Sequence, residues 1–110
     1  TQSVSNSQDM VIDLFNTQHF GGAKVLVELR NTTDNIFETT EIVVNHDGRT
    51  GQNATAHNHT VYATVRSDGN TTALATFTTT LAAGVLRLVA NPNDSGKNYT
   101  MKVGWQAFEI

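Results

Sequence analysis

Residues 99–107 read YTMKVGWQA, and two kinds of side chain alternate along them. On one side of an extended chain lie the apolar members of this stretch, which are Tyr99, Met101, Val103, Trp105 and Ala107. Such a period of two is typical of a strand with one buried face, because successive side chains point to opposite faces of a sheet. The sequence therefore predicts a half-buried strand over residues 98–108.

The same alternation recurs toward the N-terminus in shorter runs that end in turn-forming residues. Six further strands are predicted, at residues 9–15, 23–30, 36–46, 60–66, 74–81 and 85–90. Asp68-Gly69 is typical of a tight hairpin because glycine accepts a positive φ, and residues 91–96 read NPNDSG, a second strong turn signal. No window shows the 3.6-residue period of a helix.

About seven short strands in one chain of 110 residues predict an all-β fold. We expect an antiparallel sandwich of two packed sheets, with jelly-roll or Ig-like connections. Residues 1–8 are polar and are predicted to be an N-terminal arm or linker, which leaves residues 9–110 as the sandwich domain. The predicted core consists of Val11, Leu14, Phe15, Val25, Val27, Leu29, Ile42, Val44, Val61, Val65, Phe77, Leu86, Leu88, Met101, Val103 and Trp105.

Composition argues against several classes of protein. The formal net charge is -3 and the seven Lys and Arg are scattered, so we expect no nucleic-acid partner, which would require a basic stripe. The chain has no cysteine, which excludes a disulfide scaffold, a thiolate zinc site and a cysteine nucleophile. No apolar stretch approaches the roughly 20 residues of a membrane span, so no membrane partner is expected either.

His57-Asn58-His59 is the most suggestive motif for metal chemistry. If these residues are extended, both imidazoles lie on one side of the strand and could chelate a transition metal. Two ligands are too few for a closed site, and the simpler interpretation is a pair of polar residues at the end of a loop. The sequence otherwise predicts no metal or cofactor.

Catalytic groupings are absent from the sequence pattern. His46-Asp47 could be half of an acid/base pair, but no serine or cysteine stands in an activating context. The carboxylates are dispersed and their spacing defines no acid/base couple. We therefore expect a protein that is not an enzyme and has no catalytic residues.

Exposed loops are the remaining place for function, because binding residues concentrate on loops held by a rigid scaffold. Three predicted loops stand out, at residues 49–59, 67–70 and 91–96. The candidate contact residues in them are Arg49, Asn53, His57, His59, Asp68, Asn70, Asn93 and Asp94.

The order of several segments resembles a known family. The segments are AKVLVEL at residues 23–29, TEIVVNHDG at 40–48, TVYATV at 60–65, LATF at 74–77, GVLRLVANP at 84–92 and YTMKV at 99–103. Together they resemble a β-sandwich module of structural proteins from tailed bacteriophages, especially phages of marine bacteria and cyanobacteria. The resemblance covers about residues 20–105, while the loop at residues 49–59 and the ending at 105–110 depart from the family pattern.

The resemblance implies a non-enzymatic virion component, such as a head-surface, tail, neck or fibre module in an extracellular particle. It implies assembly with other virion proteins, with a homo-oligomer expected, and it transfers no catalytic residues. The alternative is an Ig-like or carbohydrate-binding adhesion module that contacts a glycan or receptor on a host surface. A cluster of exposed aromatic side chains would favour that alternative.

Overall fold

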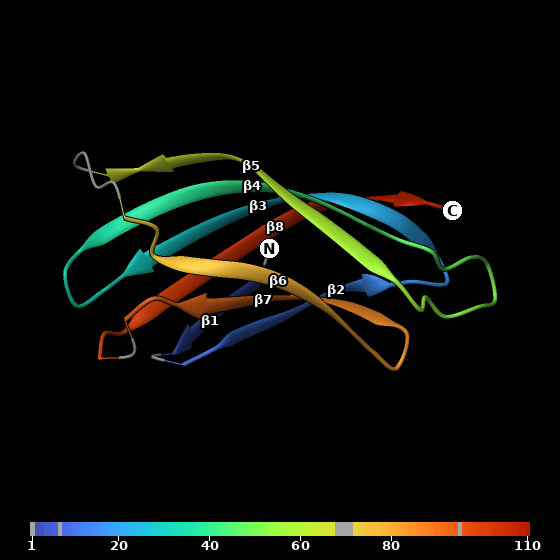
Figure 1. Cartoon of the computed structure of the whole chain (residues 1–110), viewed down its shortest axis with the longest axis horizontal. Helices are drawn as coiled ribbons and strands as arrows, with labels where there is room; N and C mark the ends of the chain where they lie inside the picture. Colours follow the sequence, from blue (N-terminus) through green and yellow to red (C-terminus); the bar gives the residue numbers. More distant parts are fainter. Residues whose placement is uncertain (1, 7, 68–71, 95) are drawn as a thin grey trace.

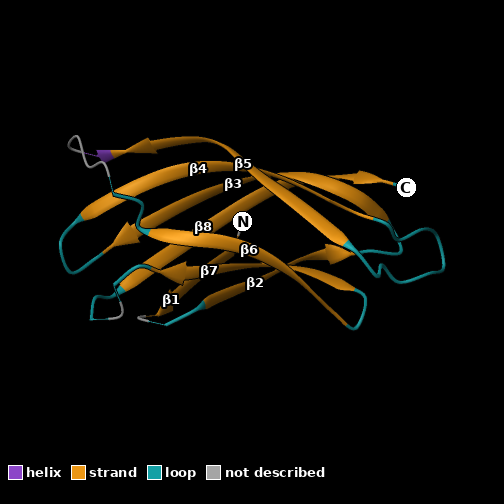
Figure 2. Cartoon of the chain, in the orientation of Figure 1, coloured by secondary structure: helices purple, strands orange, loops and turns teal. Residues whose placement is uncertain are grey.

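The computed structural model describes residues 2–6, 8–67, 72–94 and 96–110. This part of the chain is built from eight strands joined by turns and loops (Figure 2). The strands are β1 (Gln2–Asn6), β2 (Met10–Asn16), β3 (Phe20–Asn31), β4 (Ile36–His46), β5 (His57–Arg66), β6 (Ala75–Ala82), β7 (Val85–Pro92) and β8 (Tyr99–Glu109). No helix in the described ranges is long and apolar enough to cross a bilayer.

The strands form two antiparallel sheets that pack face to face (Figure 1). One sheet has the order β1-β8-β3-β4-β5 and the other has the order β2-β7-β6. Strands β3, β4 and β5 follow one another directly, and β8 returns to lie beside β3, which is the order of a Greek key. The predicted all-β, antiparallel two-sheet sandwich is therefore confirmed.

The core lies between the two sheets and is densest under β3 and β8. Val25, Val27 and Leu29 of β3 are fully buried, and the residues between them face outward. Val27 lies opposite Val103 of β8, and the side chains of directly paired residues share one face of the sheet. The alternation seen in the sequence thus corresponds to one buried and one exposed face in these central strands.

Strand β2 differs from its predicted packing. Val11 was expected in the core but is 46% exposed, whereas Met10 and Ile12 on either side of it are buried. The pairing of β2 with β7 shifts between Asp13 and Phe15, which marks a β-bulge. A bulge lets two successive residues face the same way, so a simple alternation counted back from Phe15 assigns Val11 to the wrong face.

Strand β5 departs further from prediction, because neither valine assigned to the core is buried. Val61 is 43% exposed and Val65 is 73% exposed. The pairing of β5 with β4 also contains a register shift, so Val61 lies opposite the buried Ile42 while Val65 lies opposite the exposed Thr39. The two valines therefore face opposite sides of the sheet, and even the inward one lies beyond the cover of the smaller sheet. Two other predicted core residues, Phe77 and Trp105, are only partly buried against the core.

The N-terminal segment is more ordered in the structure than the expected arm. Gln2–Asn6 forms β1, which pairs antiparallel with β8 from Gln2 opposite Val103 to Asn6 opposite Tyr99. The chain then crosses to the other sheet at β2. The polar composition of these residues suits an edge strand, because an edge has one side open to solvent.

The molecule is elongated, with extents of 45 × 23 × 21 Å, and its loops gather at the two ends of the long axis (Figure 1). One end carries the β2–β3 turn, the β4–β5 loop and the β6–β7 turn. The opposite end carries the β3–β4 turn, the β5–β6 connection and the β7–β8 loop. In the β6–β7 turn both central residues have positive φ, 50° at Ala83 and 81° at Gly84, which matches the right-handed twist of a hairpin.

Candidate functional site

The loop residues singled out from the sequence do not form one site. Arg49 and Asn53 are exposed in the β4–β5 loop, whereas Asn93 and Asp94 are exposed in the β7–β8 loop at the other end. Asp68 and Asn70 lie outside the described residues. The predicted contact residues are therefore separated along the long axis of the molecule, and each end must be considered separately.

At the first end, Asp47 organises the β4–β5 loop. Its carboxylate accepts hydrogen bonds from the Thr55 hydroxyl (2.7 Å), the Thr55 amide (2.7 Å) and the Ala56 amide (2.8 Å). These donors favour the ionised form and lower the pKa of Asp47 from 3.8 to about 2, with the Thr55 hydroxyl contributing most. Asp47 therefore holds the loop in shape, and His46-Asp47 is not arranged as an acid/base pair.

Thr17 joins the three connections at this end. Its hydroxyl donates to the Gly84 carbonyl (3.1 Å) and accepts from the Ala54 amide (3.2 Å), and the residue is fully buried. Nearby, the side-chain Nε2 atom of Gln18 donates to the side-chain oxygen of Asn53 (2.6 Å). These bonds fix the loop that contains Arg49 and Asn53 against its neighbours.

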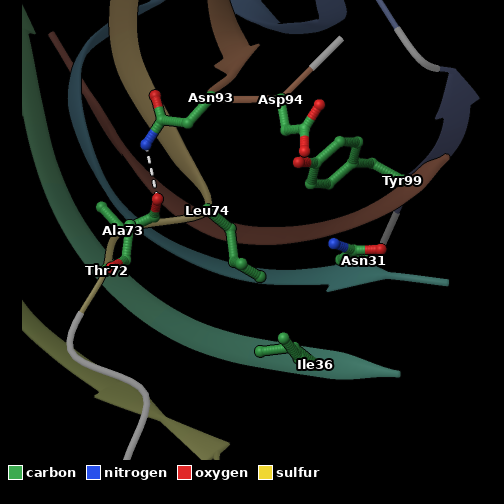
Figure 3. Close-up of a pocket in the computed structure, with 8 residues that line it drawn as sticks. All are labelled: Asn31, Ile36, Thr72, Ala73, Leu74, Asn93, Asp94 and Tyr99. Atoms are coloured by element: carbon green, nitrogen blue, oxygen red, sulfur yellow. Dashed lines mark hydrogen bonds between the residues drawn. The ribbon is translucent and has the colours of Figure 1, made fainter. Parts of the chain in front are cut away.

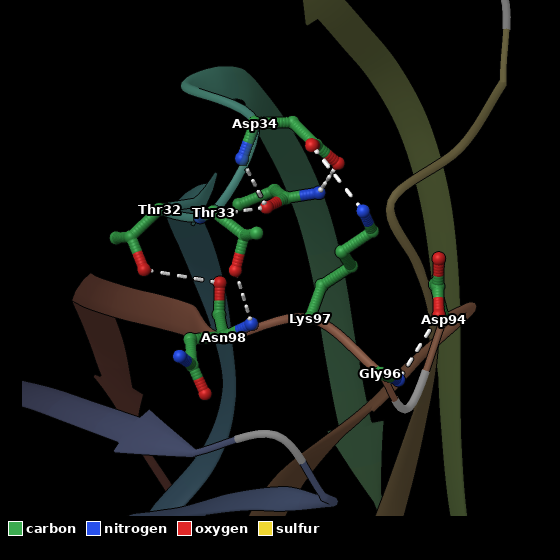
Figure 4. Close-up of polar contacts among 8 residues, drawn as sticks. Thr32, Thr33, Asp34, Asp94, Gly96, Lys97 and Asn98 are labelled. Atoms are coloured by element: carbon green, nitrogen blue, oxygen red, sulfur yellow. Dashed lines mark hydrogen bonds and ion pairs between the residues drawn. The ribbon is translucent and has the colours of Figure 1, made fainter.

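At the opposite end, polar side chains tie the β3–β4 turn to the β7–β8 loop (Figure 4). The Thr32 hydroxyl donates to the Asn98 carbonyl (3.1 Å), and the Asn98 amide donates to the Thr33 hydroxyl (2.9 Å). Lys97 lies 3.4 Å from the Asp34 carboxylate. The carboxylate of Asp34 is thus already paired. The network holds the β3–β4 turn and the β7–β8 loop together at this end of the molecule.

A cavity of about 210 Å³ lies beside this network (Figure 3). Asn31, Ile36, Thr72, Ala73, Leu74, Asn93, Asp94 and Tyr99 line it. The side chain of Asn93 points across it and donates to the Ala73 carbonyl. Burial, and to a smaller extent the nearby charge of Asp94, raises the pKa of the Tyr99 phenol, which keeps it protonated. A protonated phenol offers a hydrogen-bond donor, and the Asp94 carboxylate lines the same cavity.

His57 and His59 lie together, as their i, i+2 spacing predicts, and both reach across to the smaller sheet. The Nδ1 atom of His57 is 2.6 Å from the Thr79 hydroxyl oxygen, and the Nδ1 atom of His59 is 3.4 Å from the same oxygen. Thr79 belongs to β6 and is 4% exposed. The two imidazoles are therefore oriented toward a common point between β5 and β6.

Strand β5 exposes apolar side chains on both faces. Tyr62, at the bulge, is 54% exposed, Val61 on the inner face is 43% exposed, and Val65 on the outer face is 73% exposed. Strand β5 is the last strand of its sheet, so its far edge presents backbone N–H and C=O groups that pair with no other described strand.

A shallow hollow marks the outer face of the larger sheet. Its volume is about 370 Å³, and it is lined by Lys24, Leu26, Glu41, Gly104, Trp105 and Gln106. Leu26 is 54% exposed, and Lys24 and Glu41 form an ion pair of 2.6 Å at the rim. The missing side chain at Gly104 leaves room between its neighbours, so apolar and charged groups face one open space.

Sequence reasoning missed three of these features. Thr79 carried no signal, because a threonine on an alternating strand is ordinary. Val61 and Val65 were predicted to be in the core, since an edge strand and a central strand show the same alternation. The hollow around Gly104 depends on which strands are adjacent, and the one available hint was a glycine within the long run at residues 99–107.

No protein-family model matches the chain, and no curated protein sequence matches it. Among solved structures, the tailspike protein of Acinetobacter baumannii phage AM24 is similar to it, with a TM-score of 0.36 and 8% sequence identity. The similarity covers 92% of this chain and 26% of the tailspike chain. The chain thus spans about a quarter of the length of that tailspike.

Proposed function

We propose that the chain is a non-enzymatic structural module of a bacteriophage virion that works by protein–protein assembly. The segments at residues 23–29, 40–48 and 84–92 occur in the same order as in virion β-sandwich modules, and this resemblance supports a role in the virion. The partners are other virion proteins and further copies of the chain, and the location is the extracellular particle. Strand β5 is the edge at which a second copy joins.

The observation that carries the proposal is the open edge of β5. Natural edges that avoid association carry Lys, Pro, inward-pointing charges or β-bulges, or are very short. Strand β5 has a bulge at Tyr62 but lacks most of the other devices. Strand β5 has ten residues, includes no Lys, Pro, Asp or Glu, and carries its formal charge at Arg66, its last residue. That arginine is engaged with Glu38, whose carboxylate lies 3.1 Å from the Arg66 Nε atom.

Antiparallel pairing of β5 with the β5 strand of a second copy satisfies the free backbone groups of both. The contact is isologous, because the same strand serves both partners across a twofold axis. It joins the two larger sheets into one and removes the exposed Tyr62 from water. A neutral strand suits self-pairing because no like charges are brought opposite one another.

Sedimentation equilibrium tests this proposal. We expect the native chain to be a dimer at micromolar concentration and the double variant Tyr62→Lys/Val65→Lys to be a monomer. Val11→Lys is the matched control, because Val11 is also exposed (46%) but lies on β2, and it should remain a dimer. A native protein that stays monomeric throughout the micromolar range, or a double variant that still dimerises, would contradict β5 pairing.

A second candidate is an adhesion module that contacts a host-surface glycan, and the hollow beside Gly104 favours it. Sugars present both apolar faces and hydroxyl groups, and the hollow combines the apolar side chain of Leu26 with the amide of Gln106 and the Lys24–Glu41 pair. A glycan array probed with the native chain and with Gln106→Ala tests it. Glycan binding that Gln106→Ala abolishes supports adhesion, and the absence of binding by the native chain counts against it.

A further inference from the structure

We propose that His57 and His59 form a binding site for one divalent transition-metal ion where β5 meets β6. The site is distinct from the edge pairing, because it uses the inward side of the first half of β5. The ion would be held by two imidazole nitrogens of the chain, with water or a group from another molecule completing its coordination.

The two imidazole rings are oriented toward the same side chain of β6. Both Nδ1 atoms approach one oxygen atom, Thr79 Oγ1, at 2.6 Å and 3.4 Å. Two rings already held on the same side of β5 lose little side-chain freedom when an ion binds between them. Thr79 is nearly fully buried, so its position is fixed by the packing of β6.

Metal binding changes the protonation of both Nδ1 atoms. Without an ion, the Thr79 hydroxyl donates its one proton to one imidazole and accepts from the other, so one Nδ1 atom accepts a hydrogen bond and the other carries a proton. With an ion present, both rings can take the Nε2–H tautomer and present both Nδ1 lone pairs to the metal.

The third histidine nearby is excluded from the site by its own bonds. His46 lies opposite His57 in the β4–β5 register. Its Nδ1 atom accepts from the Gly48 amide (2.9 Å), and its Nε2 atom bonds to the Phe20 carbonyl. Across the described ranges no three His, Cys, Asp or Glu side chains gather as a metal cluster. The site therefore provides two protein ligands, and we expect the ion that they hold to exchange with solution.

The ligand type selects the class of ion. Neutral imidazole suits Cu²⁺, Ni²⁺ and Zn²⁺, whereas Ca²⁺ and Mg²⁺ prefer oxygen ligands. Among the former, affinity should follow the general order in which Cu²⁺ exceeds Ni²⁺. Because the ion binds the folded arrangement of β5 and β6, it should also raise Tm as its concentration increases.

Isothermal titration calorimetry of untagged protein with CuCl₂, NiCl₂, ZnCl₂ and CaCl₂ tests the site. We expect one transition-metal ion per chain, with Cu²⁺ the tightest and Ca²⁺ unbound. His57→Gln and His59→Gln should each weaken binding about tenfold or more, since even losing an outer-shell partner of a metal ligand costs that much. The double variant should be little weaker than either single variant, because loss of one ligand already destroys the chelate.

Two controls separate chelation from other causes. His19→Gln removes an exposed histidine of the β2–β3 turn and should leave the affinity unchanged. Thr79→Val removes the shared hydrogen bond but keeps both rings, so it should still bind copper even if its Tm falls. Absence of saturable binding, an equal loss in His19→Gln, or complete loss in Thr79→Val would each overturn the proposal.

Discussion

Strands β3 and β5 have similar alternating sequences and very different environments. In β3 the alternate residues Val25, Val27 and Leu29 are completely buried. In β5 the corresponding valines, Val61 and Val65, are 43% and 73% exposed. Strand β3 has a neighbour on each side, β8 and β4, and the smaller sheet beneath it, whereas β5 pairs with β4 on one side. Alternation thus identifies a strand, and its place in the sheet determines whether a face is covered.

The comparison predicts a large difference between two chemically identical substitutions. Val27→Ala should destabilise the fold by about 2–3 kcal/mol, because it removes buried methyl groups and leaves a cavity. Val65→Ala should change the free energy of unfolding by less than about 0.5 kcal/mol, since its side chain is mostly in water. Urea unfolding of both variants checks this. The measurement is made at a protein concentration at which the chain is monomeric, where equal costs at the two positions would contradict the difference in burial.

A smaller loss of stability is expected at the ion pair between Arg66 of β5 and the buried Glu38 of β4. Glu38 is 1% exposed, and its carboxylate accepts from Arg66 Nε (3.1 Å) and from the Leu74 amide (3.3 Å). Arg66→Ala should cost about 1–3 kcal/mol, less than for a fully buried pair because the Arg66 side chain is 30% exposed.

A double-mutant cycle with Glu38→Gln sharpens that expectation. In the Arg66→Ala background, Glu38→Gln should recover part of the stability, because a neutral amide loses less than a carboxylate when its cationic partner is gone. The free energies of unfolding of the four proteins give the coupling. Strict additivity would show that the two side chains act independently.

The loop that leads into β5 should give a pH-dependent effect. Because folding lowers the pKa of Asp47 from 3.8 to about 2, its contribution to stability is complete above the unfolded value and is lost as the pH falls toward 2. Asp47→Asn should therefore lower Tm at neutral pH, and the difference from the native protein should vanish near pH 2. Thr55→Val, which removes one of the three donors, should show a smaller difference in the same pH window. A Tm difference that persists below pH 2 would contradict this linkage.

The smallest effect is expected on the outer face of β3. Lys24 and Glu41 are paired at 2.6 Å, with side chains 57% and 21% exposed. Glu41→Gln should change stability by less than about 0.5 kcal/mol, because water screens the charges and competes for them. Thermal unfolding at low and at high salt measures it. A cost as large as that of Val27→Ala would show that the outer face of β3 is as strongly coupled to the fold as its inner face.

Much of the strand pattern could be predicted from residues alone, and the errors have specific causes. The seven predicted strands correspond to β2–β8, since period-two alternation and Asn, Asp and Gly turns are local signals. Val11 was misplaced because a bulge changes the alternation within β2. Strand β1 was taken for an arm because a polar strand at an edge has no buried side to mark it in the sequence.

The candidate sites were also predictable only in part from the sequence. The i, i+2 spacing of His57 and His59 was sufficient to place both imidazoles on one side of a strand. Their shared partner, Thr79, is about twenty residues away along the chain, and only the packing of β5 against β6 brings it within reach. The contact residues Asn53 and Asn93 were predicted together as loop residues, but the length of the strands separates them to opposite ends.

The sequence determined that this chain forms antiparallel strands around one core, because turn chemistry and alternation act between residues close in the chain. The tertiary structure determined which strands became edges, where Tyr62 and Val65 are exposed, and which side chains meet between the sheets. Those outcomes depend on strand order and on bulges, which arise from contacts between residues far apart in the chain. Local pattern therefore specified the elements, and long-range packing specified the surfaces from which we infer function.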